Sequence, residues 1–521
     1  MSKSLLDFEF DEVVKAELNK WKVPGLSISV VQGSQTYAKA YGLAEYANDD
    51  EGRPSRQMTT DALFAACSTT KAFTAAAASI AIQESQSTKH PIHWDTTVAS
   101  LIPEDFVLAD QDATHNVTME DALSHRTGIP QHNWTLALFP GKTATTGSAV
   151  RAMRHMSLAT PLRSKYHYSN HMFIAVSHAL ERHTGIPLGE FLNNRIWEPL
   201  GMNNTYFTAA EVKKSPPSAA KLVQGYDWIP TDDGGSFLPR PDNDWPANSG
   251  AGAMYSNVLD YARWVRELIE MEGPLKGHQT LLDPRTIHFE NGDVNLPAPF
   301  HAYGLGWFVD NYRGNYLYSH AGGWPGYGIY VGFVPSMKFG FVIMGNSSSA
   351  RYAAFRLFTF LLDKHLQLPV DSVYEGQLAE VIANQTKEWQ AGFTNEKIDV
   401  SKRRLFPRLP DPPIPHTLCL ARYAGTYQHP AELDIVLRAE PGGLTADLQD
   451  RVIPCELSLV HASGEFFVGR LHREGLDLLP PFSVEFCLNG QGLVDRVGLL
   501  IEPDIKGKKV WFNRVESEYL Q

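Results

Sequence analysis

Residues 64–79 read Phe-Ala-Ala-Cys-Ser-Thr-Thr-Lys-Ala-Phe-Thr-Ala-Ala-Ala-Ala-Ser, and the fold class follows from this stretch. Small, helix-favouring residues predominate, so we expect a helix that begins near Ser68 and ends at about Glu84. Residues three apart share a helix face, which lets the Ser68 hydroxyl and the Lys71 amine point into one cleft. A nucleophile beside a base suits covalent catalysis. Because Ser-x-x-Lys also occurs by chance, an ordinary helix with a surface lysine stays open as the alternative.

The composition is that of a globular protein with more than one folding unit. The chain has 521 residues, 43% of them hydrophobic and 20% charged, which fits two or three domains. The formal net charge of -12 argues against nucleic acid as a partner, because phosphate binding needs basic patches. The four cysteines lack paired metal-ligand spacing, so reduced thiols are the simplest interpretation.

The hydropathy pattern contains no targeting or membrane signal. The N-terminal residues lack the apolar core of a signal peptide. Elsewhere, no stretch approaches the about 18 uninterrupted apolar residues of a membrane helix. We therefore expect a cytoplasmic protein that has no membrane partner.

Two further groups of residues downstream are candidates for an active site. Tyr168 and Asn170 are one residue apart, so on an extended or turn segment both face the same way. Residues 320–328, His-Ala-Gly-Gly-Trp-Pro-Gly-Tyr-Gly, join two expected strands, and their glycines let the backbone approach a ligand closely. Taken separately, the first pair fits a surface turn and the second group a plain β-turn.

The local patterns predict a mixed chain that ends in β-structure. Residues 10–21 are typical of an amphipathic helix, and residues 26–31 and 36–41 of a hairpin. The proline-rich residues 403–415 indicate a semi-rigid linker. Beyond Tyr423, short apolar runs alternate with turn residues, which favours a small all-β domain.

Three groups therefore follow one another along the chain, in the contexts of a helix start, a loop and a glycine-rich strand: Ser68-Thr-Thr-Lys71, Tyr168-Ser-Asn170 and His320-Ala-Gly322. Their order resembles the serine β-lactamase and penicillin-binding protein superfamily, specifically its class C-like esterase and peptidase branch. The resemblance covers roughly residues 8–365 and includes the segments 118–130, 181–202 and 303–307. From about residue 416 the chain looks like the lipocalin-like domain of some members.

The resemblance implies an α/β (α+β) fold. Its core would be a β-lactamase/transpeptidase-like antiparallel sheet flanked by helices, with an all-helical subdomain inserted between the first strands and the last. A C-terminal all-β, barrel-like domain would follow. We expect the catalytic domain at residues 1–370, a helix and proline-rich linker at 371–415, and the lipocalin-like domain at 416–521.

The resemblance also implies a covalent acyl-enzyme. Ser68 would be the nucleophile, Lys71 would take or relay its proton, and Tyr168 would act as general base and acid. To perform these roles, Lys71 should lie buried near Tyr168 rather than reach solvent. Asn170 would hold Lys71 or the substrate.

Substrate binding is the role that the family implies for the third group. The backbone N–H groups of Ser68 and Gly323 would form an oxyanion hole, and Gly322 and Trp324 belong to the same binding set. Where many β-lactamases carry Lys-Thr-Gly, this chain has His320, which near an unperturbed pKa of about 6.5 is mostly neutral in the cytosol. A weaker anchor for anions favours esters, thioesters or neutral amides over β-lactams. The aromatic residues near the three groups either line an acyl pocket or pack in the core: Trp134, Trp324 and Tyr327.

These inferences together predict a serine hydrolase of small molecules that acts through an acyl-enzyme on Ser68. The main alternative is an acyltransferase that passes the acyl group to an acceptor other than water, as in natural-product tailoring. A D-amino-acid peptidase, a true β-lactamase and a non-catalytic binding or assembly protein are less favoured. We expect neither a cofactor nor a metal, and the oligomeric state stays open.

Overall fold

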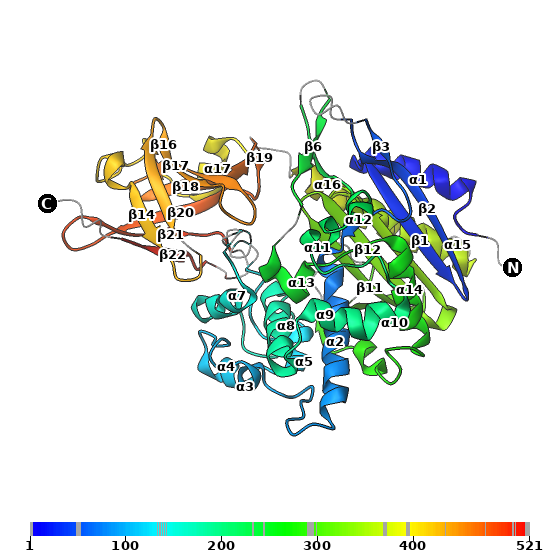
Figure 1. Ribbon diagram of the computed structural model, residues 1–521. Helices are drawn as coiled ribbons and strands as arrows, with labels where there is room; N and C mark the ends of the chain where they lie inside the picture. Colours follow the sequence, from blue (N-terminus) through cyan, green and yellow to red (C-terminus); the bar gives the residue numbers. More distant parts are fainter. Residues whose placement is uncertain are drawn as a thin grey trace.

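The computed structural model divides the chain into a helix-covered sheet and a β-barrel (Figure 1). The ribbon places the barrel, drawn in yellow to red, beside the helical part of the larger unit. The structure describes residues 4–47, 54–132, 134, 137, 139, 141, 143–231, 234–242, 245–288, 296–298, 300–367, 372–391, 396–432, 434–474, 476–502, 505 and 507–515.

The larger unit is built on an antiparallel sheet whose strands come from both ends of that unit. The first strand of the predicted hairpin pairs with the second on one side and with the last strand of the sheet in sequence on the other, which brings the first and last segments together. The order across the sheet is β3-β2-β1-β13-β12-β11-β10-β9-β8. The bounds are β1 Gly25–Gln32, β2 Gln35–Glu45, β3 Arg56–Gln57, β8 Thr286–His288, β9 His301–Tyr303, β10 Phe308–Tyr312, β11 Asn315–Trp324, β12 Tyr327–Val334 and β13 Phe339–Gly345.

Helices cover both faces of this sheet, because its central strands β1, β12 and β13 are buried along their whole length. One face packs against α1 (Phe8–Trp21) and α15 (Ala350–Leu366). The other face packs against α14 (Val258–Glu270) and the helices inserted between β2 and β8. The helix-flanked antiparallel sheet and the inserted helical subdomain are therefore confirmed.

The helical subdomain is centred on α2 (Thr70–Ser85), the predicted alanine-rich helix. Every residue from Thr70 to Ala81 is buried, since alanine side chains let neighbouring helices approach closely. A capping box forms in the segment 118–130, with Thr118 and Asp121 satisfying each other's backbone N–H groups. The other helices here are α3 Val98–Leu101, α4 Gln111–Asn116, α5 Met119–Leu123, α7 Thr146–Ala152, α8 Asn170–Thr184, α9 Leu188–Leu192, α10 Glu198–Leu200, α11 Ala209–Lys213, α12 Pro216–Ala219 and α13 Ser249–Gly252.

Short strands and two further helices complete the connections. A pair of short strands, β4 (Phe64–Ala65) and β7 (Tyr255–Ser256), leads into the Ser68 region, and a hairpin joins β5 (Gly225–Ile229) to β6 (Ser236–Arg240). The helices α16 (Ser372–Ala391) and α17 (Ile398–Leu405) lead to the barrel. Residues 403–405 were predicted as the start of the linker, but they form the last turn of α17.

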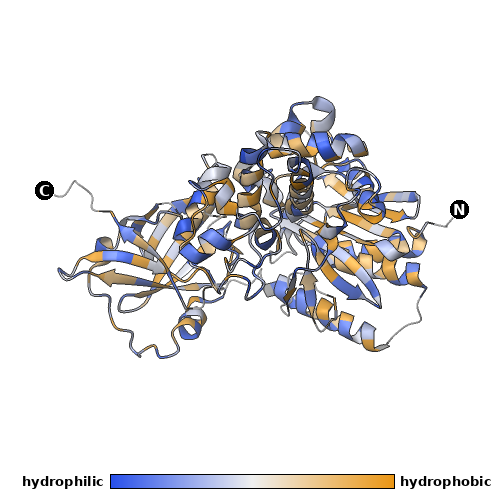
Figure 2. Cartoon of the chain, turned by 90° about the horizontal axis from the view of Figure 1, so that it is seen from below, coloured by the Kyte–Doolittle hydropathy of each residue, from blue (hydrophilic) through white to orange (hydrophobic). Residues whose placement is uncertain are grey.

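The C-terminal domain is a closed antiparallel barrel, which confirms the predicted all-β architecture. Its strand order is β17-β16-β15-β14-β22-β21-β20-β18-β19, and pairing of β17 with β18 closes it. Hydrophobic and hydrophilic residues alternate along its strands (Figure 2), so alternate side chains fill the interior. The bounds are β14 Gly425–Gln428, β15 Ile435–Glu440, β16 Gly443–Leu448, β17 Cys455–Ser463, β18 Phe466–Arg473, β19 Leu476–Asp477, β20 Phe482–Leu488, β21 Val494–Leu499 and β22 Val510–Arg514.

Within the described part of the chain, no helix combines the length and the apolar character that crossing a bilayer needs.

The cysteines differ in accessibility, which generates a prediction about their reactivity. Burial raises the pKa of both Cys67 and Cys455 to about 12, whereas Cys419 is exposed. Since the thiolate is the reactive form, a disulfide reagent should modify Cys419 first in the native protein. Cys67 and Cys455 should react only after denaturation in guanidinium chloride, with sites assigned by peptide mass spectrometry. Rapid native modification of Cys67 would contradict the structure around the Ser68 turn.

Candidate active site

Ser68 lies in a tight turn that presents its hydroxyl. It belongs to a single 3₁₀ turn, Cys67–Thr69, that precedes α2, so it is not itself in the α-helix as the sequence suggested. Cys67 adopts a left-handed backbone conformation with φ of 51°, which is uncommon for a residue with a side chain. Ser68 is partly exposed, while Cys67 and Thr69 on either side are buried. The turn therefore directs a single hydroxyl out of an otherwise buried segment.

Lys71 is completely buried beneath that hydroxyl. Its Nζ lies 3.2 Å from Ser68 Oγ, and it donates hydrogen bonds to Asn170 Oδ1 at 2.6 Å and to the Ala251 carbonyl at 2.7 Å. Burial lowers the pKa of Lys71 well below its usual value, which favours the neutral amine. A neutral amine has two N–H donors and one lone pair. The two carbonyl-type acceptors use both donors, so the lone pair is left facing the Ser68 hydroxyl.

The loop before α8 brings the second group of predicted residues to Lys71. Asn170 is the first residue of α8 and contacts the Lys71 amine directly. The Lys71 Nζ lies 4.9 Å from the centre of the Tyr168 ring, and Tyr168 is half-buried. The expectation that Lys71 is buried near Tyr168 is confirmed.

His125, which lies in the segment 118–130 and was not among the predicted site residues, packs against Tyr168. Their ring centres are 4.4 Å apart, and His125 is fully buried with a left-handed φ of 58°. Its Nδ1 accepts a hydrogen bond of 3.0 Å from the backbone N–H of Ser169. Burial lowers the pKa of His125 well below its usual value, and protonation of the nearby Lys71 would lower it further. A neutral ring with Nδ1 as acceptor must carry its proton on Nε2, so both the tautomer and the orientation are set.

His320 lies on β11 and is also a buried, neutral ring. Its Nδ1 donates to the Ala321 carbonyl at 2.6 Å, and its Nε2 accepts from the Tyr303 hydroxyl at 3.0 Å. Burial is the main reason that the pKa of His320 falls to about 3. The imidazole thus contributes no positive charge to the site near neutral pH.

The glycines after His320 bring the backbone of β11 against the Ser68 turn. A methyl group on Gly322 would lie 2.9 Å from the Ala66 carbonyl oxygen and 3.3 Å from the Ser68 nitrogen, so only glycine fits. Pairing of β11 with β10 ends at Ser319, whereas pairing with β12 continues to Trp324. The edge of β11 beyond Ser319 is therefore open next to Ser68. Gly323 is exposed there.

The three aromatic residues named from the sequence have three different environments. Tyr327 is fully buried in the core, where its hydroxyl donates to the Val223 carbonyl at 3.1 Å. Trp134 packs against the interior of the barrel domain. Trp324 is half-buried and lines a cavity that the barrel covers. Of the three, Trp324 has the position of a pocket residue.

Two family models match the chain, one for each unit. A model described as Beta-lactamase matches residues 10–359. A model described as a domain of unknown function (DUF3471) matches residues 409–514. The first covers the sheet and the helical subdomain, and the second covers the barrel.

Relatives with similar sequences extend over both units. A protein from Aspergillus campestris (strain IBT 28561) named Unguisins hydrolase ungD' is 35% identical over 517 residues, covering 98% of this chain and 92% of the relative. Unguisins hydrolase ungD from Aspergillus violaceofuscus (strain CBS 115571) is 34% identical over 538 residues, covering 98% and 91%. The octameric penicillin-binding protein homologue from Pyrococcus abyssi has the same fold, with a TM-score of 0.57, 20% identity and coverage of 97% and 99%.

The family assignment rests on the length of these matches. The Beta-lactamase match spans more than half of the chain, and full-length relatives exceed 30% identity. The fold around the Ser68 turn agrees with it. The chain belongs to the Beta-lactamase family and is an enzyme of the serine hydrolase type.

Proposed function

We propose that this enzyme forms an acyl-enzyme through Ser68 and hydrolyses a small molecule that is an unguisin or chemically related to the unguisins. The observation that carries the catalytic part is the hydrogen bonding of Lys71. Its two N–H groups bind Asn170 and Ala251, which leaves the lone pair toward Ser68 Oγ at 3.2 Å. A buried neutral amine in that position is a competent general base.

In the proposed acylation, Ser68 Oγ attacks the substrate carbonyl carbon while its proton passes to Lys71 Nζ. The carbonyl oxygen becomes an oxyanion between the backbone N–H groups of Ser68 and Gly323. Its collapse breaks the bond to the leaving group, which takes a proton through Tyr168 from the Lys71 ammonium. Water then attacks the ester on Ser68, with Tyr168 and Lys71 accepting its proton, and the acid product leaves as Ser68 regains its hydrogen.

Two features support an uncharged or weakly charged substrate and transfer to water. His320, which stands where many relatives have lysine, is neutral, so the site lacks that fixed anchor for a carboxylate. The two full-length relatives are both named as hydrolases. We therefore favour hydrolysis of an ester, thioester or amide over acyl transfer to another acceptor. A panel of unguisins, simple esters, thioesters and amides tests the substrate class. Product analysis tests whether the acyl group is transferred to water.

The nucleophile is tested by covalent labelling. A fluorophosphonate probe should add one label to the native protein at Ser68, and Ser68→Ala should abolish both the label and turnover. We expect kcat/KM to fall at least about 1,000-fold, because removal of a nucleophile disables the catalytic unit as a whole. Intact and peptide mass spectrometry give the readout. Ser87→Ala, at an exposed serine, is the matched control. Labelling or turnover that survives in Ser68→Ala would exclude the mechanism.

The protonation state of Lys71 should appear in the pH dependence. The base acts only when it is neutral, so kcat/KM should rise with pH through the pKa of Lys71. Because burial lowers that pKa, activity should already be high near neutrality. Lys71→Met should lower kcat/KM by about 10²–10⁴-fold and remove this ionisation from the profile. Lys276→Met, at an exposed lysine, should keep the profile. A Lys71→Met profile identical in shape to the native one would contradict the assignment.

His125 is expected to act as a positioning residue for Tyr168. His125→Asn keeps an acceptor for the Ser169 N–H and a residue that tolerates φ of 58°, but it removes the ring from Tyr168. Loss of an aromatic contact worth about 0.5–1.5 kcal/mol should lower kcat by up to about tenfold and leave KM nearly unchanged. The measurement is steady-state kinetics, with thermal melting as the fold control. An unchanged kcat would mean that the ring does not position Tyr168.

A further inference from the structure

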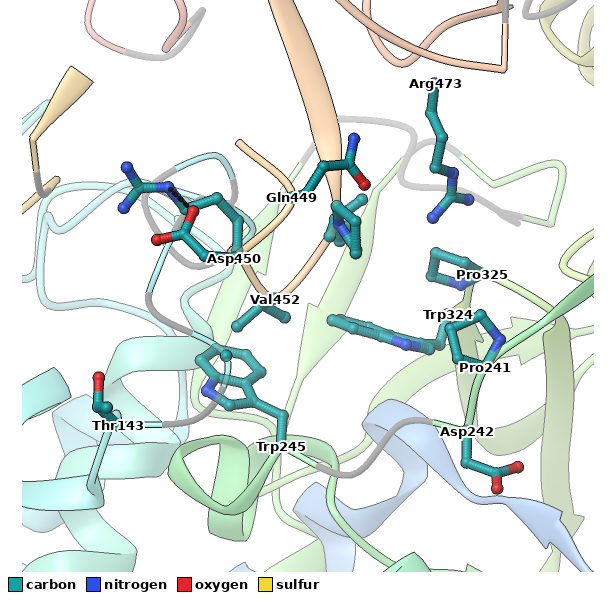
Figure 3. A pocket seen from close by; sticks show the side chains of 14 residues that line it. Thr143, Pro241, Asp242, Trp245, Trp324, Pro325, Gln449, Asp450, Val452 and Arg473 are labelled. Carbon is teal, nitrogen blue, oxygen red and sulfur yellow. Dashed lines mark ion pairs between the residues drawn. The ribbon is translucent and has the colours of Figure 1, made fainter. Parts of the chain in front are cut away.

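A cavity of about 390 Å³ lies where the barrel meets the catalytic unit (Figure 3). Its size falls within the range of small-molecule sites. Both units contribute to its walls, and most of the lining is apolar. The lining residues are Gly141, Thr143, Pro241, Asp242, Trp245, Trp324, Pro325, Gln449, Asp450, Arg451, Val452, Ile453, Pro454 and Arg473.

Strand β11 contacts the Ser68 turn at Gly322 and lines the cavity at Trp324. Successive side chains of a strand alternate between faces, so Gly322 and Trp324 point to the same side. The missing side chain of Gly322 would point at the Ser68 turn, whereas Gly323 faces Arg351 on the opposite side. Two strand residues span about 7 Å. The Trp324 ring therefore lies on the Ser68 side of the sheet, one short step beyond the proposed oxyanion hole.

The barrel side of the cavity is held in place by backbone hydrogen bonds. The loop between β16 and β17 runs antiparallel to residues 137, 139 and 141 of the helical subdomain. Val452 N donates to the Phe139 carbonyl and Ile453 N to the Ala137 carbonyl, both at 2.9 Å. The Gly141 N–H donates to the Asp450 carbonyl at 3.1 Å. The loop is thus a fixed wall, which makes the cavity a preorganised site.

The chemistry of the walls favours an apolar group. The Trp245 and Trp324 rings lie near one another, with centres 6.3 Å apart and planes at 27°, and Val452 is on the facing side (Figure 3). Among the charged residues, Asp242 is paired with Lys213 at 2.5 Å. Arg473 meets Asp227 only at 3.4 Å, and Asp227 also holds Arg240 at 2.6 Å. The guanidinium of Arg473 points toward Pro325 at the rim, where it can orient a substrate oxygen.

We propose that this cavity is the subsite for an aromatic or other large apolar group that the substrate carries next to its scissile carbonyl, and that the barrel loop 449–454 sets this specificity. The inference rests on the proposed function, since it assumes that the scissile carbonyl is bound at Ser68. It gives the barrel domain a direct role in substrate selection. Trp245 and Trp324 supply the aromatic wall, and Val452 closes the opposite side.

The test compares substrates that differ only in a phenyl group. One pair varies the acyl side, p-nitrophenyl propanoate against p-nitrophenyl 3-phenylpropanoate, and the other varies the alcohol, ethyl acetate against 2-phenylethyl acetate. The measured quantity is kcat/KM for the phenyl substrate divided by kcat/KM for its smaller partner. Val452→Trp should fill the cavity and lower this ratio at least tenfold in one pair. That is at the low end of what an apolar pocket discriminates, about 10–200-fold per methylene. Trp324→Ala should lower the same ratio by removing the ring.

The control variant places a tryptophan at the far end of the barrel. Leu493 is exposed in the turn between β20 and β21. Because Phe466 pairs with Glu485 and Gly469 with Phe482, this turn lies beyond the Phe466 end of β18, opposite Arg473. Leu493→Trp should leave both ratios unchanged. Thermal melting of each variant checks the fold, and Trp324→Ala carries the test if Val452→Trp does not fold.

A binding measurement separates this inference from the catalytic proposal. Saturation-transfer NMR on the Ser68→Ala protein should show contact with the phenyl group of N-acetyl-phenylalaninamide, and adding Val452→Trp should abolish it. Ratios that stay constant in both pairs, or that fall equally in Leu493→Trp, would overturn the subsite. Turnover that does not depend on Ser68, with the NMR contact intact, would overturn the proposed function and leave the subsite standing.

Discussion

The site depends on the burial of the Lys71 amine among uncharged groups. Among the residues that the structure describes, its hydrogen-bond partners are the Ser68 hydroxyl, the Asn170 amide oxygen and the Ala251 carbonyl, all of them uncharged. Burying an ammonium ion among neutral groups is costly, and the amine avoids this cost by releasing its proton. The same contacts that hold the side chain thus create its basicity. A carboxylate at any of these positions would stabilise the ammonium form and remove the base.

The cost of burying a positive charge applies equally to His125 and His320, which lie beside the site. A protonated His125 or His320 would add positive charge close to Lys71, and both are buried and hydrogen-bonded as neutral rings. Each has one nitrogen committed as an acceptor, from the Ser169 N–H and from the Tyr303 hydroxyl respectively. Burial lowers the pKa of all three basic residues in this small volume, which favours a pocket low in fixed charge. That property agrees with the weaker anionic anchor that His320 suggested from the sequence.

The parts of the site that local sequence patterns could predict are those that local geometry determines. The spacing of Ser68 and Lys71, the capping box at Thr118 and the alternating pattern of the strands need only neighbouring residues. The left-handed conformation of Cys67 is not visible in helix propensity, and the strand packed against this turn, β11, comes from a segment about 250 residues later in the chain. His125 could have been recognised only through its long-range contact with Tyr168. Its one local signal was its position at the end of a helix just before Gly128.

Local sequence patterns also fail to predict how the barrel contacts the rest of the chain. Those contacts explain why the barrel accompanies the catalytic unit. Its strands were predictable, but the hydrogen bonds of residues 450, 452 and 453 with residues 137, 139 and 141 join segments more than 300 positions apart. The Beta-lactamase match ends at residue 359, yet both Aspergillus relatives align over 98% of this chain. A barrel that served only as an attached module would need no such backbone pairing to the helical subdomain. The barrel loop 449–454 and Trp324 line the same cavity. A change in this loop therefore changes the wall of that cavity. On the proposed subsite the two units act as one body, in which the barrel loop shapes the space beside the Ser68 turn that the sheet positions.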